Sequence, residues 1–103
     1  MSREGGADVV ITGVNKSAEY VDIANRGDQP QDLGGWVLLP ERGSQACGLG
    51  SVLQPGQALR IWAMAEDAGQ GGYNCGFGTN IWNNSKSDPA VLYYVAGNEV
   101  DRW

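Results

Sequence analysis

The sequence predicts an all-β fold in which antiparallel strands form a sandwich or a barrel. Short runs of alternating apolar and polar residues recur roughly every ten residues, as strands do in such folds. Glycine, proline, asparagine and aspartate separate these runs, and glycine alone accounts for 16 of the 103 residues. Apolar residues nowhere repeat with helical spacing for as many as about three turns, which argues against long helices.

Six runs are expected to form strands. They are Asp8–Asn15, Ala18–Asn25, Gly35–Pro40, Ala58–Met64, Ala90–Val95 and, as an edge strand, Glu99–Trp103. Successive side chains of a strand point to opposite faces, so Val21 points inward and Tyr20 points outward in the second run. In the fourth run Ile61 points inward. Trp62 is therefore expected on the outer side of its sheet, on the same face as Arg60.

Turn-forming residues connect the strands. Pro55 and Gly56 are expected at the centre of a type II turn, because proline presets a φ near about −65° and glycine accepts a positive φ. A polar, glycine-rich loop is expected at residues 41–51. The interval after the fourth strand is expected to contain a helical turn at Ala63–Ala68 and then a loop over residues 73–77.

The length fits one domain, so residues 8–103 are assigned to a single domain and residues 1–7 to a flexible, vector-like lead-in. The net charge is −5 and histidine is absent. Without histidine there is no Ser-His-Asp triad and no imidazole ligand for a metal. The acidic charge argues against nucleic acid as a partner. Membrane insertion is not expected either, because no apolar run approaches about 18 residues.

Cys47 and Cys75 are the only cysteines in the sequence. They are too few for a structural zinc site and lack Cys-x-x-Cys spacing. Both lie in glycine-rich, turn-like sequence, where a disulfide would tie two loops together; two separate thiols in a reducing cytosol are the alternative. A disulfide would indicate an oxidising compartment, and hence an extracellular or cell-envelope location.

Several segments of the chain follow one another in a distinctive order. They are Asp8–Ile11, Glu19–Asp28, Asp32–Leu38, Leu53–Trp62, Ile81–Asn84, Ala90–Tyr93 and Gly97–Val100. Leu-x-Gly-Trp, Leu-x-Pro-Gly and Trp-Asn-Asn occur within them in this sequence order, and the combination resembles the lamin tail domain family. The resemblance implies an immunoglobulin-like antiparallel β-sandwich of about seven to nine short strands.

The resemblance is closer to prokaryotic members of that family than to nuclear lamins. With a net charge of −5, the basic surface of the nuclear versions is not expected, and neither is a coiled-coil rod. Prokaryotic members occur as accessory modules on secreted or envelope proteins, often beside hydrolase domains. The resemblance therefore implies a non-catalytic binding or scaffolding module, excised from a larger extracellular or cell-envelope protein. A purely structural spacer domain is the alternative.

Aromatic residues and one arginine are the candidate partner-binding residues. They are Tyr20, Arg60, Trp62 and Tyr73. Aromatic rings that reach the surface can stack on sugars or pack on proteins, so the expected partner is a protein or a polysaccharide. Packing within the core or the loops is the alternative for these side chains, and Trp36 is expected in the core.

The acidic residues do not indicate catalysis. A carboxylate-dependent hydrolase, the third functional class, would need two carboxylates about 5–10 Å apart, one of them with a raised pKa. The candidates are instead scattered over turns and solvent-facing positions: Asp22, Asp28, Asp32, Glu66, Asp67 and Asp88. No enzymatic activity, cofactor or bound metal is therefore expected.

Overall fold

The structure is a computed structural model that describes residues 8–40, 46–78 and 89–103. These residues form ten strands and one 3-10 helix. In chain order they are β1 (Val9–Asn15), β2 (Tyr20–Asn25), β3 (Gln31–Asp32), β4 (Val37–Pro40), β5 (Cys47–Gly48), β6 (Val52–Leu53), β7 (Ala58–Met64), η1 (Ala65–Gln70), β8 (Tyr73–Phe77), β9 (Ala90–Tyr93) and β10 (Glu99–Arg102). Three of the strands, β3, β5 and β6, are two-residue pairings within loops, too short to show an alternation pattern.

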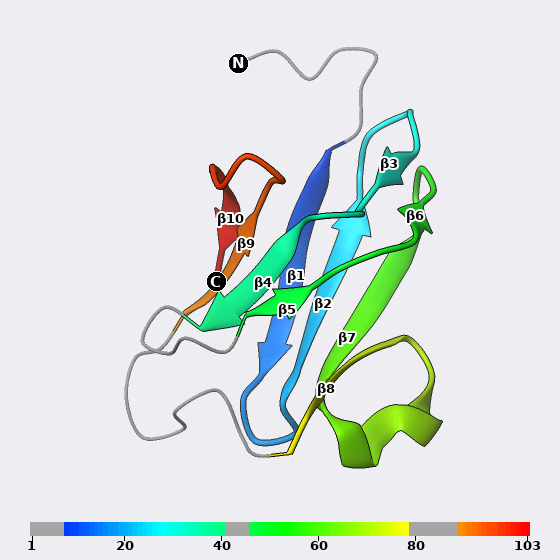
Figure 1. Ribbon diagram of the computed structural model, residues 1–103. Helices are drawn as coiled ribbons and strands as arrows, with labels where there is room; N and C mark the ends of the chain where they lie inside the picture. Colours follow the sequence, from blue (N-terminus) through cyan, green and yellow to red (C-terminus); the bar gives the residue numbers. More distant parts are fainter. Residues whose placement is uncertain (1–7, 41–45, 79–88) are drawn as a thin grey trace.

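Two four-stranded sheets lie face to face (Figure 1). One sheet has the strand order β1-β2-β7-β8, and the other has the order β10-β9-β4-β5. The short pair β3-β6 lies at one end of the sandwich. The predicted all-β, immunoglobulin-like sandwich is confirmed.

The core lies between the two sheets and follows the predicted alternation. Val21 and Ile61 point inward from neighbouring strands of one sheet, and Leu92 points inward from the other; all three side chains are fully buried. Trp36, which is 4% exposed, packs edge-on against Tyr94 with their ring centroids 5.0 Å apart. The expected core position of Trp36 is confirmed.

The turns match their predicted chemistry. Gly56 has a φ of +77°, and Gln57 N–H donates to the Gln54 carbonyl at 3.0 Å, as a type II turn over Pro55-Gly56 requires. Gly35, at the corner where the chain crosses between the sheets, has a φ of +82°. A Cβ added there would contact Val95, so glycine also permits the close approach of these two segments.

One strand pair departs from the antiparallel arrangement, and the expectation of a loop over residues 73–77 is wrong. These residues form β8, which pairs parallel with β7. Parallel neighbours need a crossover, and η1 provides it by returning the chain toward the start of β7. Gly72 makes the approach possible, because a Cβ at this residue would collide with the Arg60 carbonyl oxygen of β7.

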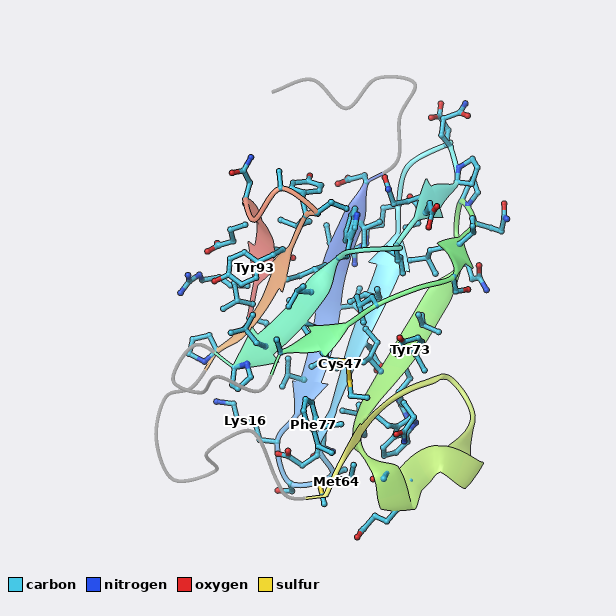
Figure 2. The ribbon with its side chains drawn as sticks, in the orientation of Figure 1. Lys16, Cys47, Met64, Tyr73, Phe77 and Tyr93 are labelled. Atoms are coloured by element: carbon cyan, nitrogen blue, oxygen red, sulfur yellow. A yellow bond between two sulfur atoms is a disulfide. The ribbon has the colours of Figure 1, made fainter. Side chains whose placement is uncertain are left out.

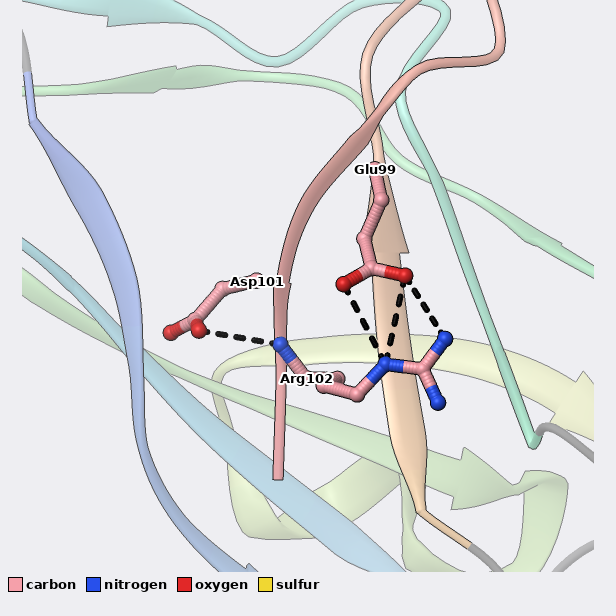
Figure 3. Close-up of polar contacts among 3 residues, drawn as sticks. All are labelled: Glu99, Asp101 and Arg102. Carbon is pink, nitrogen blue, oxygen red and sulfur yellow. Dashed lines mark hydrogen bonds and ion pairs between the residues drawn. The ribbon is translucent and has the colours of Figure 1, made fainter. Parts of the chain in front are cut away.

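The edge strands β1 and β10 lie against each other on one side of the sandwich. Asp101 Oδ2 accepts a hydrogen bond from Ile11 N–H at 2.9 Å, which joins the two sheets. Its other oxygen, Oδ1, accepts from Arg102 N–H at 2.9 Å, and the Arg102 side chain pairs with Glu99 (Figure 3). Both edge strands have a register shift at this side, between Ile11 and Gly13 and between Glu99 and Asp101. Such irregularities make an edge a poor template for further strands.

Candidate functional site

A cluster of four outward-facing side chains lies on β2 and β7. The antiparallel register pairs Tyr20 with Trp62 and Asp22 with Arg60. The alternate residues of both strands point into the core, so these four share the outer face of the sheet. We call Tyr20, Asp22, Arg60 and Trp62 the Arg60 cluster.

The Arg60 guanidinium has a defined position in this cluster. Its Nε donates to Asp22 Oδ1 at 2.8 Å, and its Nη2 donates to Asp22 Oδ2 at 3.0 Å. Its central carbon lies 3.9 Å from the centroid of the Tyr20 ring and 5.8 Å from that of Trp62. The two rings meet edge-on with centroids 4.9 Å apart. A bidentate carboxylate and a cation–π contact thus hold one arginine from two directions.

The cluster is open to solvent and its charges balance. The side chains of Arg60 and Asp22 are 46% and 28% exposed. Hydrogen bonding to Asp22 raises the pKa of the Arg60 guanidinium above its usual value. An exposed pair of this kind contributes little to stability. Its main consequence is therefore to orient a cation at the protein surface.

The predicted partner-binding residue Tyr73 lies elsewhere. Its pairing with Ile61 places it on the inner side of β8, where its hydroxyl donates to the Gly48 carbonyl of β5 at 2.7 Å. Figure 2 labels Tyr73 and Cys47, which belong to β8 and β5, the edge strands on one side of the sandwich. The structure thus brings together three of the four predicted residues and separates the fourth.

The two cysteines form a disulfide between the edges of the sheets. Cys47 on β5 is bonded to Cys75 on β8, with a Cα–Cα distance of 5.5 Å (Figure 2). The prediction of a bridge is confirmed. Together with the Tyr73–Gly48 hydrogen bond, it closes the side of the sandwich opposite β1 and β10.

A comparison with family models gives a match to the lamin tail domain over residues 2–103. The chain belongs to the lamin tail domain family. Lamin tail domains are immunoglobulin-like domains of a non-enzymatic family, in agreement with the two-sheet fold. A search of curated proteins finds no significant match.

Asp22 is the member of the cluster that sequence reasoning did not single out for binding. Alternation places Asp22 on the same face as Tyr20, and this signal was available in the sequence. Its role as the partner of Arg60 depends on the β2–β7 register, across 38 residues of sequence. In this lamin tail domain, the register places the Asp22 carboxylate where it binds the Arg60 guanidinium.

Among the described residues, the remaining acidic candidates do not gather into a metal-binding cluster. Within residues 8–40, 46–78 and 89–103, no three His, Cys, Asp or Glu side chains gather closely enough to hold a metal ion. Asp32 Oδ1 accepts from Gly34 N–H at 2.8 Å, a local turn contact. Asp88 and Trp82 lie outside the described residues. Among the described residues, no helix has the length and apolar character needed to span a membrane.

Proposed function

We propose that this lamin tail domain is a non-catalytic binding module and that the Arg60 cluster is its contact surface. The observation that carries the proposal is the oriented guanidinium of Arg60, held by Asp22 and Tyr20 on an open sheet face. Arginine, tryptophan and tyrosine are the residues most enriched at energetically important contacts. An arginine that is already oriented loses less conformational entropy when a partner binds.

Docking on the sheet face is favoured over addition of a strand to a sheet edge. Strand addition needs an edge with free backbone groups. At the β1–β10 side, Asp101 accepts from Ile11 N–H. At the β5–β8 side, the Gly48 carbonyl accepts from the Tyr73 hydroxyl and Asn74 accepts from Gly76 N–H, so side chains occupy part of the backbone groups of both edges. The outer face of β2 and β7 is therefore the better candidate.

The proposal extends to the setting of the domain. We propose an extracellular or cell-envelope location, because the chain contains the Cys47–Cys75 disulfide and disulfides form and persist in oxidising compartments. We also propose that the domain is related to the prokaryotic members of the family and is an accessory module of a larger protein. The net charge of −5 supports a partner other than nucleic acid.

The binding proposal is tested with the purified domain against arrayed polysaccharides and a displayed peptide library. Arg60→Ala and Trp62→Ala remove the cluster, whereas Arg102→Ala removes an arginine that also pairs with a carboxylate, on another strand. Contacts of this kind contribute on the order of 2 kcal/mol each, so affinity should fall about thirtyfold in either cluster variant. The Arg102→Ala variant should bind like the wild type. Ligands that bind all variants equally would place the contact surface elsewhere.

A purely structural spacer is the second candidate. The closure of the sandwich at both sides favours it, because such closure stiffens a domain without creating a site. Replacing the domain in its parent protein by an unrelated sandwich separates the two functions. A spacer predicts unchanged localisation and activity of the parent, whereas a binding module predicts that one of them is lost.

A further inference from the structure

The Arg60 guanidinium keeps one hydrogen-bonding edge available. Arginine presents two forks of parallel N–H groups, one from Nε and Nη2 and one from Nη1 and Nη2. Asp22 occupies the first fork. Within residues 8–40, 46–78 and 89–103, Asp22 is the only hydrogen-bond acceptor of this side chain. The second fork is therefore open on a side chain that is already oriented.

Charge decides which kind of acceptor suits this open fork. The Arg60–Asp22 pair is neutral as a unit, and the whole chain has a net charge of −5. A ligand carboxylate or phosphate at the second fork would lie close to Asp22 and would be repelled by it. Neutral oxygen atoms, such as hydroxyl or ether oxygens, meet no such repulsion. The Asp22 carboxylate also retains lone pairs that can accept from a hydroxyl group.

The surroundings of the cluster favour a sugar over a protein partner. The core of a protein interface is rich in buried apolar area. Among the described residues, the large exposed hydrophobic side chains are Val52, Val95 and Trp103, and none of them belongs to β2 or β7. The apolar surface of the cluster comes from the half-buried rings of Tyr20 and Trp62. Such rings can pack on the C–H faces of a pyranose while polar neighbours bind its hydroxyl groups.

We infer that the ligand of the Arg60 cluster is a neutral polysaccharide, with adjacent hydroxyl groups bound by Arg60 and Asp22 and a sugar ring packed on Trp62. The inference rests on the proposed binding function and specifies its ligand. The cluster lies on the outer face of a sheet, so it suits several units of an extended polymer rather than one enclosed sugar.

Affinity electrophoresis and calorimetry with defined polysaccharides test this inference. The neutral set is β-glucan, mannan, xylan and soluble chitin oligomers, and the anionic set is alginate, hyaluronate and dextran sulfate. At least one neutral polymer is expected to bind. Raising the salt concentration from about 0.05 M to about 0.5 M should change its affinity less than about twofold, because no net charge is neutralised.

The variants separate hydrogen-bond geometry from charge. Arg60→Lys keeps the charge but loses the fork, and Trp62→Ala loses the ring, so each should weaken binding at least about tenfold. Asp22→Asn is a nearly isosteric change that removes the charge of the carboxylate that orients Arg60, and it should also weaken binding. Arg102→Lys is the matched control and should bind like the wild type. Thermal unfolding of each variant checks that the fold is kept, and the Asp22→Asn and Arg60→Lys results stand even if Trp62→Ala fails to fold.

Three outcomes overturn the inference: no neutral polymer binds, binding is confined to anionic polymers and falls steeply with salt, or neutral binding is unchanged in Arg60→Lys and Asp22→Asn. The proposed binding function is judged by different outcomes. If a peptide ligand binds and the cluster variants lose it, the binding function stands and the polysaccharide inference is wrong. If no ligand of any class depends on the cluster, both are wrong.

Discussion

The carboxylate of Asp101 accepts a hydrogen bond from the backbone amide of Ile11 at 2.9 Å, across 90 residues of sequence. It joins the first strand of the described chain to the last, and each is the edge of a different sheet. A side chain thus satisfies a backbone donor that would otherwise face outward from the edge of a sheet.

Removing this carboxylate should open the β1–β10 side. Asp101→Ala should lower the free energy of unfolding by about 1–2 kcal/mol, because a hydrogen bond to a charged acceptor is lost from a partly buried site. Amide hydrogen exchange at Ile11 should accelerate more than exchange in β7. Asp101→Asn keeps an acceptor oxygen and should have a milder effect. Unchanged exchange at Ile11 in Asp101→Ala would contradict the assigned role.

Removing the disulfide should destabilise the opposite side. Cys47 and Cys75 are separated by 28 residues. Closing a loop of this size stabilises a fold by about 3–4 kcal/mol in the chain-entropy model, so the double variant Cys47→Ala/Cys75→Ala should lose about this amount in urea unfolding. The wild-type protein unfolded under reducing conditions is the control and should behave similarly. Alkylation of both cysteines in the native protein without reductant would show that the bridge is absent in solution.

Alanine at Gly72 should disturb the parallel pairing of β8 with β7. Gly72 has a φ of +68°, and an added Cβ would collide with the Arg60 carbonyl oxygen. Gly56 is the control, because its φ of +77° is similar but, among the described residues, no heavy atom beyond Gly56 and its two chain neighbours lies within 4 Å of an added Cβ. Gly56→Ala should cost about 1–2 kcal/mol from backbone strain alone. Gly72→Ala should lower the free energy of unfolding by about 1–3 kcal/mol more than Gly56→Ala, because the backbone of β7 or β8 must move to relieve the collision. Equal losses in urea unfolding would refute the steric explanation.

Asn25 is a fully buried hydrogen-bonding centre at the end of β2. Its Nδ2 donates to the carbonyls of Gln29 at 2.7 Å and Leu53 at 3.0 Å. Its Oδ1 accepts from the amides of Asp8 at 3.1 Å and Gly27 at 3.0 Å. Every hydrogen-bonding group of the side chain amide is thus used, and the contacts link segments before and after it in the chain.

Asn25→Asp should be strongly destabilising although it hardly changes the shape of the side chain. The carboxylate cannot donate, so two carbonyls lose their donor and a charge is buried. A loss of about 3 kcal/mol or more is expected in urea unfolding at neutral pH. Asn98→Asp, in the exposed turn between β9 and β10, makes the same change at the surface and should be nearly neutral. Similar losses in both variants would mean that burial of Asn25 is not the cause.

The Glu99–Arg102 pair should be visible in a pH titration. Hydrogen bonds from Arg102 lower the pKa of Glu99. Because the folded-state pKa lies below the unfolded one, the stabilising contribution of the pair is complete above the unfolded value and is lost as the pH falls through the folded value. The carboxyl carbon of Glu99, followed by NMR, should titrate at lower pH in the wild type than in Arg102→Gln. Coinciding midpoints would contradict the pairing in Figure 3.

Much of the fold could be predicted from local patterns. Alternation placed Val21 and Ile61 in the core and Tyr20 and Trp62 outside, because the side-chain period of a strand is a property of the backbone itself. The Pro55-Gly56 turn was predictable for the same local reason. The pattern did not reveal β8, because glycine and asparagine interrupt its alternation and its pairing depends on the crossover through η1.

The candidate site was predictable only in part. The outward faces of their strands predict three of its residues. The sequence pattern does not separate Tyr73 from these three, although its hydroxyl donates to the Gly48 carbonyl on the inner side of β8. Asp22 was not expected to bind anything. The difference arises because a site is defined by contacts between strands, and the register of distant strands is a tertiary property.

The sequence alone determined the class of fold, the inward faces and the absence of a histidine-based site, since each follows from composition or local periodicity. It also indicated the family, through the resemblance of its ordered motifs to the lamin tail domain. Tertiary structure decided which edges are closed and which side chains meet. Asp22 and Arg60 are 38 residues apart, and only the packing of β2 against β7 sets their carboxylate and guanidinium 2.8 Å from each other. Long-range pairing of this kind depends on the packing free energy of the whole sandwich, and the sequence of a short segment does not determine that energy.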